Sequence, residues 1–343
     1  MHKNQKYRLV NLDGLRGWAA VFVAMMHFPL DGVTHQLPLI KNGFLFVDLF
    51  FVLSGVVISY VYLGNFDRKK FFIARFARLG PIYFATLMLA VILEIIKVVG
   101  IGGFDGGFRE PNSLDGLFRE FFLIHTFPMF SNTSFNPPNW SVAVEAYAYV
   151  LFALLSIFTF KRSFFVWVLF SVISFCLIFK AGVLNDAHNL AIPRGILGFS
   201  LGVISFNLWH FYLKDTELKY LGDLGLLLIF LYIWWGGSSL FPPALAMTIG
   251  VTMMLAGANR MHFSILMENR LAVQLGKYSF AIYMIHYFIA MRFDEIYRYL
   301  PSSSVVEIAL FFVYCSTTWL VAGLVYKHFE WPLRNYIRDR WQN

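Results

Sequence analysis

Long apolar segments recur along almost the whole chain, and they constrain its fold more than any other feature. Windows of about 17–25 mostly apolar residues are each long enough to cross a hydrocarbon layer of ~30 Å as a helix. Because 58% of the 343 residues are hydrophobic and 14% are charged, one soluble core could not bury the apolar side chains, and lipid must cover much of the surface. The sequence therefore predicts an all-α, polytopic transmembrane bundle that forms a single domain over residues 1–343.

The apolar windows divide into about ten predicted spans. These cover residues 12–30, 43–63, 80–99, 140–160, 163–180, 190–209, 222–236, 240–258, 276–292 and 303–326. The seventh is short, and Gly236-Gly237 followed by Pro242-Pro243 predicts a tight hairpin between it and the eighth. Ten spans would place both termini on one side of the membrane.

Lysine and arginine residues predict which side this is, because basic residues collect in cytoplasmic loops. Nineteen of them fall on the side of the termini and six on the opposite side, while three lie within or at the ends of spans. Both termini are therefore expected in the cytoplasm. The same scatter of basic residues explains the net charge of +8 without a nucleic-acid partner.

The opening segment does not predict a cleaved signal peptide, and the two cysteines do not predict a disulfide or a metal site. Met1–Arg8 is polar and basic, and no small-residue cleavage site follows it, so we expect it to be retained rather than removed as a signal peptide. Cys176 and Cys315 lie within apolar runs and are expected to pack as small side chains. Neither a disulfide nor a metal site is predicted.

The longest connection between predicted spans covers residues 100–139 and is rich in Gly, Asn and Pro. It contains a possible amphipathic stretch, Leu114–Phe130, on the predicted outer face. Long connections of this kind are often binding loops or lids. An interfacial helix that seals the bundle explains the pattern equally well.

The first predicted span carries an arginine and a histidine eleven residues apart, Arg16 and His27. On an α-helix eleven residues return to nearly the same face, and the two side chains lie roughly 16 Å apart along the axis. Ionisable residues within a membrane usually face the bundle interior and are candidates for function. The alternative is that Arg16 extends to the interface and His27 bonds a neighbouring backbone group.

Other ionisable residues are predicted at the depth of His27, near the outer surface. Asp48 lies about five residues below the outer end of the second span, and Glu145 about five below that of the fourth. Ser141 shares a helix face with Glu145, and His286 lies near the outer end of the ninth span. A carboxylate beside an imidazole fixes its tautomer, as a general base requires; alternatively, Asp48 pairs structurally with another helix.

Two arginines, Arg75 and Arg78, stand three residues apart just before Pro81 and the third span. If this segment is helical, both guanidinium groups point the same way, which suits phosphate recognition on the cytoplasmic side. Orientation anchors that contact lipid headgroups are the alternative.

Taken together, these segments resemble acyltransferase family 3 of polytopic membrane proteins, which includes bacterial O-antigen and exopolysaccharide O-acetyltransferases. The resemblance runs from Leu12 to about Trp331, and the combination of motifs is specific whereas each one alone is weak. The motifs are Arg16-x10-His27, the run Val47–Gly55, Arg75-x-x-Arg78, Trp140-Ser141-x-x-x-Glu145, and Tyr278-Ser279 leading to His286. Some members of this family carry a second acidic residue beside the motif glutamate. In this sequence the neighbours of Glu145 are Val144 and Ala146.

The resemblance implies an enzyme of the bacterial inner membrane that transfers an acyl group from acetyl-CoA, or another short acyl-CoA, to a hydroxyl of an extracytoplasmic glycan, without a metal. His27 matches the family's essential histidine and Arg16 its motif arginine, and three groups of residues are assigned roles. The expected catalytic residues are His27, Asp48 and Glu145; the donor-binding residues are Arg16, Arg75 and Arg78; and the acceptor-binding residues are Trp140, Ser141, Arg194 and His286.

Several alternatives stay open at this point. His27 could act as general base on the sugar hydroxyl or accept the acyl group itself, and Trp140 could belong to an interfacial aromatic belt. The chain ends about fifteen residues after its last predicted span, so we expect no fused extracytoplasmic hydrolase-like domain. A secondary transporter, a glycan flippase or a membrane scaffold would also be polytopic, although the Arg16/His27 pattern has no counterpart in the second half.

Overall fold

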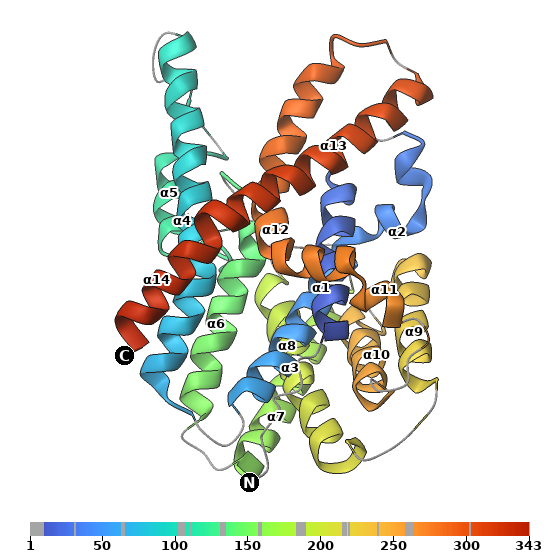
Figure 1. The fold of residues 1–343 in the computed structure, drawn as a ribbon. Coiled ribbons are helices and arrows are strands. Elements are labelled where there is room, and N and C mark those ends of the chain that lie inside the picture. The colour runs from blue at the N-terminus through green and yellow to red at the C-terminus, as the bar shows by residue number, and fades with distance from the viewer. Residues whose placement is uncertain are drawn as a thin grey trace.

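The structure is a computed structural model, and it describes most of the chain. The described residues are 10–30, 32–62, 66–101, 107–109, 111–130, 135–156, 160–182, 190–214, 218, 220–238, 240–257, 262, 264–301 and 303–342. Within them the fold is all-helical and contains no strand (Figure 1). The predicted fold class is confirmed to that extent.

The chain forms fourteen α-helices within the described residues. They are α1 (Val10–Met26), α2 (Pro38–Lys41), α3 (Phe46–Tyr62), α4 (Arg68–Ile101), α5 (Leu114–Phe121), α6 (Asn139–Leu155), α7 (Phe160–Ala181), α8 (Ala191–Leu208), α9 (Leu221–Trp235), α10 (Pro243–Gly257), α11 (Ser264–Glu268), α12 (Arg270–Tyr297), α13 (Ser304–Val325) and α14 (Trp331–Gln342). Single turns precede α2 and α3, and π-helical turns lie at Trp209–Leu213 and Tyr326–Glu330.

A helix lies in each of the ten segments predicted to span the membrane. Five helical stretches in the described part of the chain are long and apolar enough to cross a membrane: Gly43–Tyr62, Arg68–Gly100, Phe164–Ala181, Ala191–Leu213 and Ser304–Trp341. Helices α6, α9 and α10 are apolar but shorter. These helices indicate a multi-pass membrane protein, whereas the count of about ten spans and the side of the termini stay predictions.

Two helices differ from their predicted extents. Helix α4 begins at Arg68 rather than at residue 80, and Pro81 lies inside it; such prolines are tolerated in membrane helices because neighbouring groups satisfy the freed carbonyl. Arg75 and Arg78 therefore lie on α4 rather than in a connection. In the stretch Leu114–Phe130, only α5 is helical, and turns follow Phe121.

Helices α1 and α12 approach each other closely because both carry glycine at the contact. A Cβ atom added to Gly17 would collide with the backbone of Gly276, and one added to Gly276 would collide with the backbone of Asp13. Small residues at membrane helix interfaces permit such contacts. Since His27 lies ten residues after Gly17 and His286 ten after Gly276, the same packing brings the two histidines together.

Helices α3 and α8 also approach each other closely at a glycine. Gly202 of α8 packs against the backbone of Val52 and Gly55 of α3, leaving no space for a side chain. This contact lies one to two turns from Asp48 on α3 and Arg194 on α8, and it allows these two side chains to meet.

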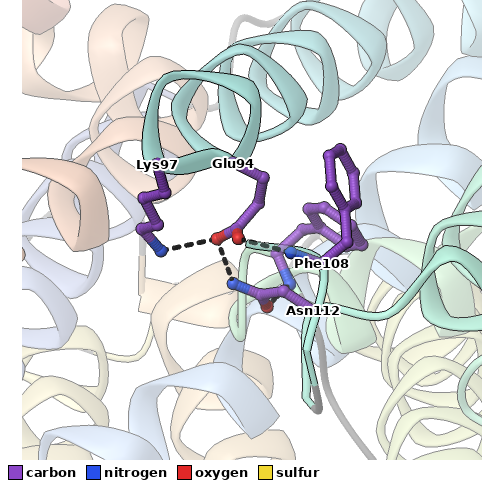
Figure 2. Close-up of polar contacts among 5 residues, drawn as sticks. Glu94, Lys97, Phe108 and Asn112 are labelled. Carbon is purple, nitrogen blue, oxygen red and sulfur yellow. Dashed lines mark hydrogen bonds and ion pairs between the residues drawn. The ribbon is translucent and has the colours of Figure 1, made fainter. Parts of the chain in front are cut away.

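The end of α4 is tied to the connection that follows it (Figure 2). The Glu94 carboxylate accepts hydrogen bonds from Lys97 Nζ (2.6 Å), Asn112 Nδ2 (2.8 Å) and the Phe108 backbone N–H (3.1 Å). Asn112 Oδ1 in turn accepts from the backbone N–H of Phe135 (2.7 Å). A buried carboxylate thus holds the described parts of this connection against the bundle.

The last two helices return the chain to α4. Helix α13 crosses the bundle obliquely and continues through the π-helical turn Tyr326–Glu330 into α14, which packs beside α4 (Figure 1). The C-terminal helix therefore lies against the helix that carries Arg75 and Arg78.

Candidate active site

The two histidines form a pair at one end of the bundle. His286 Nε2 lies 3.2 Å from His27 Nδ1, which also lies 2.9 Å from the Val23 carbonyl oxygen, while His286 Nδ1 lies 3.1 Å from the Ile282 carbonyl oxygen. Because a carbonyl oxygen can only accept, Nδ1 of each neutral ring carries the hydrogen. His286 Nε2 then accepts from His27 Nδ1. Among the described residues no hydrogen bond to His27 Nε2 is recorded, and the lone pair on this nitrogen suits a base or nucleophile.

Asp48, which was expected to orient His27, has a different partner. Its carboxylate receives two hydrogen bonds from Arg194, Nη2 to Oδ2 at 2.6 Å and Nε to Oδ1 at 3.3 Å, with both side chains at most 3% exposed. The Arg194 guanidinium also lies over the ring of Trp140, 5.4 Å from its centroid. The structure corrects the expected contact: Asp48, Arg194 and Trp140 form one buried cluster, and the described hydrogen bonds of His27 involve a carbonyl and His286.

Glu145 likewise bonds groups other than His27. One oxygen, Oε1, accepts hydrogen bonds from Ser54 Oγ (2.7 Å) on α3 and from Tyr149 OH one turn along α6. The carboxylate lines a cavity between α1, α3, α4, α6, α12 and α14. Its expected contact with His27 is corrected in the same way as that of Asp48.

The cavity has a volume of about 270 Å³, and six charged residues line it. The charged lining residues are Asp13, Arg16, Arg75, Arg78, Glu145 and Arg334. Four guanidinium groups thus face two carboxylates, which makes the cavity attractive to anions.

The arginines of the cavity interact electrostatically with nearby carboxylates, among them Glu145 and Glu330. Within the described part of the chain, the structure records no ion pair for any of the four. Arg75 lies instead over the rings of Tyr62 and Tyr149, at 5.9 and 5.6 Å, and its Nε is buried without a hydrogen-bond partner in the described structure. Half-buried arginines without a recorded ion pair are suited to bind an anionic ligand.

Ser141 and Tyr283 lie away from the arginines, because the Tyr283 ring contacts Phe50 near the start of α3 whereas Arg75 lies over Tyr62 at the end of α3. Their hydroxyl oxygens lie 2.6 Å apart, and Tyr283 OH donates to the Pro138 carbonyl oxygen (3.1 Å). The Tyr283 ring lies 5.8 Å from the His286 ring, centroid to centroid. Tyr283 therefore stands between the cavity, which it lines, and the histidine pair.

The ten predicted site residues thus form three neighbouring groups. The structure places Arg16, Arg75, Arg78, Ser141 and Glu145 in one cavity, His27 with His286, and Asp48 with Arg194 and Trp140. Their chemical roles stay predictions.

Several polar lining residues were not predicted as site residues from the sequence: Asp13, Ser54, Tyr149, Ser279, Tyr283 and Arg334. Arg334 was counted only as an orientation charge, whereas Tyr283 could have been found because it stands three residues before His286 on a helix. Among the described residues, the structure shows no cluster of three or more His, Cys, Asp or Glu side chains suited to a metal ion.

Long apolar helices around a cavity lined by four half-buried arginines indicate a multi-pass membrane protein. The particular family follows from comparison with known proteins: the chain belongs to the acyltransferase family whose model, described as "Acyltransferase domain", matches residues 9–327. The resemblance seen in the motifs is confirmed.

Relatives with curated names agree with this membership. The chain is 25% identical over 379 aligned residues to a "Putative O-acetyltransferase" of Staphylococcus aureus strain COL, covering 97% of this chain and 58% of that protein. It is 28% identical over 168 residues to the "Peptidoglycan O-acetyltransferase OatA" of Listeria monocytogenes, covering 43% of this chain and 24% of that protein. The corresponding match to the "Putative peptidoglycan O-acetyltransferase YrhL" of Bacillus subtilis is 28% over 169 residues, covering 45% and 24%.

This chain therefore spans little more than half the length of the first of these relatives. No solved structure matches it significantly.

Proposed function

We propose that the protein is a membrane-bound O-acyltransferase that moves an acetyl or other short acyl group from cytoplasmic acyl-CoA to a hydroxyl of an extracytoplasmic glycan. The observation that carries this proposal is the cavity, which has four arginines at one end and the pair of His27 and His286 beyond the other. In this proposal the chain crosses a bacterial inner membrane about ten times, with both termini in the cytoplasm.

The arginine end of the cavity suits the phosphates of the donor. Guanidinium groups bind phosphate oxygens in charge-assisted, often bidentate hydrogen bonds. Ligand pockets usually measure about 300–1,000 Å³, so a cavity of about 270 Å³ suits the pantetheine arm, with the nucleotide held at its mouth. The arm would run past Glu145 and Ser54 and bring the thioester to Ser141 and Tyr283.

The histidine pair supplies the base. In direct transfer, His27 Nε2 removes the proton of the glycan hydroxyl while its oxygen attacks the thioester carbonyl; the C–S bond breaks, and the imidazolium returns the proton to the CoA thiolate. In the covalent route, Nε2 attacks the thioester carbonyl, the C–S bond breaks and CoA leaves as the thiolate; the glycan hydroxyl then attacks the acyl-imidazolium, the N–acyl bond breaks, and the hydroxyl proton passes to the thiolate. His286 serves both routes, because it accepts from Nδ1 and keeps Nε2 unprotonated.

The acceptor class is proposed from the relatives. Two of those named above act on peptidoglycan according to their names, so a cell-wall glycan is the first acceptor to test. An O-antigen or exopolysaccharide, which the motifs suggested, is the second.

The proposal is tested with the purified protein in lipid nanodiscs, labelled acetyl-CoA and peptidoglycan fragments or exported polysaccharides. Alkali-labile label on a glycan with the wild type, and its loss in His27→Ala, would support the proposal. His328→Ala is the matched control, because His328 is exposed on the π-helical turn before α14. If the wild type neither binds nor hydrolyses any short acyl-CoA, the proposal fails and a transporter becomes the better explanation.

The two routes are distinguished by mass spectrometry of the acid-quenched enzyme. An acetyl group on His27 after incubation with the donor alone would identify the covalent route.

A further inference from the structure

The C-terminal helix contributes a cation to the cavity. Arg334 of α14 lines the same cavity as Arg16 of α1 and as Arg75 and Arg78 of α4. It reaches this position because α14 packs beside α4, after α13 has crossed the bundle (Figure 1). Residues from both ends of the described chain thus converge on one site.

Arg334 differs from the other arginines of its helix. Arg338 and Arg340 are exposed, as expected of residues that contact water or lipid headgroups, whereas Arg334 is partly buried against the cavity. An arginine that served only to orient the helix would gain nothing from this position, because burial of a guanidinium costs free energy unless a counter-charge compensates it.

A buried carboxylate lies behind the arginines. Glu330 precedes Arg334 by four residues, is 3% exposed, and interacts electrostatically with both Arg78 and Arg334. Its Oε2 has no hydrogen-bond partner in the described structure. Glu330 also belongs to a π-helical turn, a local irregularity that is frequent at functional sites. We expect it to hold the two arginines toward the cavity.

Resting on the proposed function, we infer that Arg334 binds the phosphate groups of the acyl donor and that α14 is a wall of the donor site. The chemistry it recognises is a phosphate monoester or diester, which the nucleotide end of CoA supplies. The headgroup of an anionic lipid offers the same chemistry, and the experiment has to separate the two sources.

The test compares binding of CoA with binding of pantetheine, which lacks the nucleotide and every phosphate, in nanodiscs of neutral phosphatidylcholine. Loss of a charge-assisted contact worth about 1.5–3 kcal/mol predicts that Arg334→Gln raises the Kd for CoA by about ten- to a hundredfold. Its Kd for pantetheine should stay unchanged, and Arg334→Lys should fall between the two. Arg340→Gln is the control, because Arg340 is an exposed arginine on another face of the same helix and should leave both affinities unchanged.

A kinetic readout distinguishes phosphate binding from a structural role. Arg334→Gln should raise the KM for acetyl-CoA with little change in kcat, and should turn over acetyl-pantetheine at the wild-type rate. Equal losses with both donors, or unchanged CoA affinity, would overturn the inference. If Arg334→Gln fails to fold, Arg334→Lys serves as the test. An ammonium group cannot reproduce the bidentate contacts of a guanidinium, so this variant should prefer CoA over pantetheine less strongly than the wild type does. An unchanged preference would overturn the inference.

Two further outcomes separate this inference from the proposed function. If wild type binds CoA and Arg334→Gln binds it equally well, the inference fails while the proposed function stands. If the wild type binds no CoA, the proposed function fails. In that case binding is measured in nanodiscs that contain phosphatidylglycerol. Binding of this lipid that depends on Arg334 would assign the cavity to a lipid headgroup and overturn the donor assignment.

Discussion

The ion pair between Asp48 and Arg194 permits a quantitative test of whether Asp48 is structural or catalytic. Both side chains are at most 3% exposed, and their closest atoms are 2.6 Å apart. Removing one partner of a buried pair typically costs about 3–5 kcal/mol, because the other charge stays buried and uncompensated, whereas replacing both by apolar residues can be nearly neutral. We therefore expect Asp48→Leu and Arg194→Met each to lower the free energy of unfolding by about 3–5 kcal/mol, and the double variant to recover most of the loss.

The assay is equilibrium unfolding in mixed micelles of dodecyl maltoside and sodium dodecyl sulfate, followed by circular dichroism. An exposed pair with the same separation, Arg298 Nη2 to Asp294 Oδ2 at 2.6 Å, is the control, and its coupling energy should be below about 1 kcal/mol. Additive losses in the Asp48/Arg194 double variant would refute the reasoning. A double variant that is stable and binds CoA, but transfers no acyl group, would indicate that Asp48 or Arg194 takes part in catalysis.

Three further predictions follow from other contacts. Replacing His286 by Phe removes the acceptor for His27 Nδ1 and should lower kcat about tenfold or more without changing CoA affinity, with His286→Asn partly active, as steady-state kinetics would show. Glu94→Gln loses the ion pair with Lys97 and weakens the contacts to Phe108 and Asn112. Amide hydrogen exchange of residues 107–109 and 111–130 should therefore become faster. The control Glu295→Gln, at an exposed ion pair, should leave this exchange unchanged. Burial lowers the pKa of His125 to about 4; because unfolded histidine titrates near ~6.5, stability should decline by about 3 kcal/mol as the pH falls from ~6.5 to ~4, and this decline should disappear in His125→Phe.

The sequence predicted the depth of a residue along its helix better than it predicted which residues of other helices lie beside it. Hydropathy and helical rise are local quantities, so helices were found in all ten predicted segments, and Arg16 and His27 lie toward opposite ends of the site. The equal depth of His27 and His286 was predicted correctly in this way. Asp48 lies in the expected helix, but its partner depends on which helices pack together.

Lateral packing in this bundle is decided by features that periodicity does not reveal. Gly202 brings α8 onto α3, so the nearest counter-charge for Asp48 is Arg194. Arg334 joins the cavity only because α14 folds back on α4, and its sequence context is that of an ordinary basic residue at a membrane surface. Contacts between distant segments therefore required the structure.

Stability and function oppose each other in the cavity. The pair between Asp48 and Arg194 shows that this bundle can neutralise a buried charge with a carboxylate. In the described part of the chain no ion pair is recorded for the four arginines of the cavity, although Glu330 interacts electrostatically with Arg78 and Arg334. A carboxylate at ion-pair distance would compensate them, but it would also compete with an anionic ligand for the same hydrogen bonds. If the donor phosphates supply the missing charge, ligand binding and folding stability are linked. Saturating CoA should then stabilise the wild type more than Arg334→Gln, and pantetheine should stabilise both variants equally.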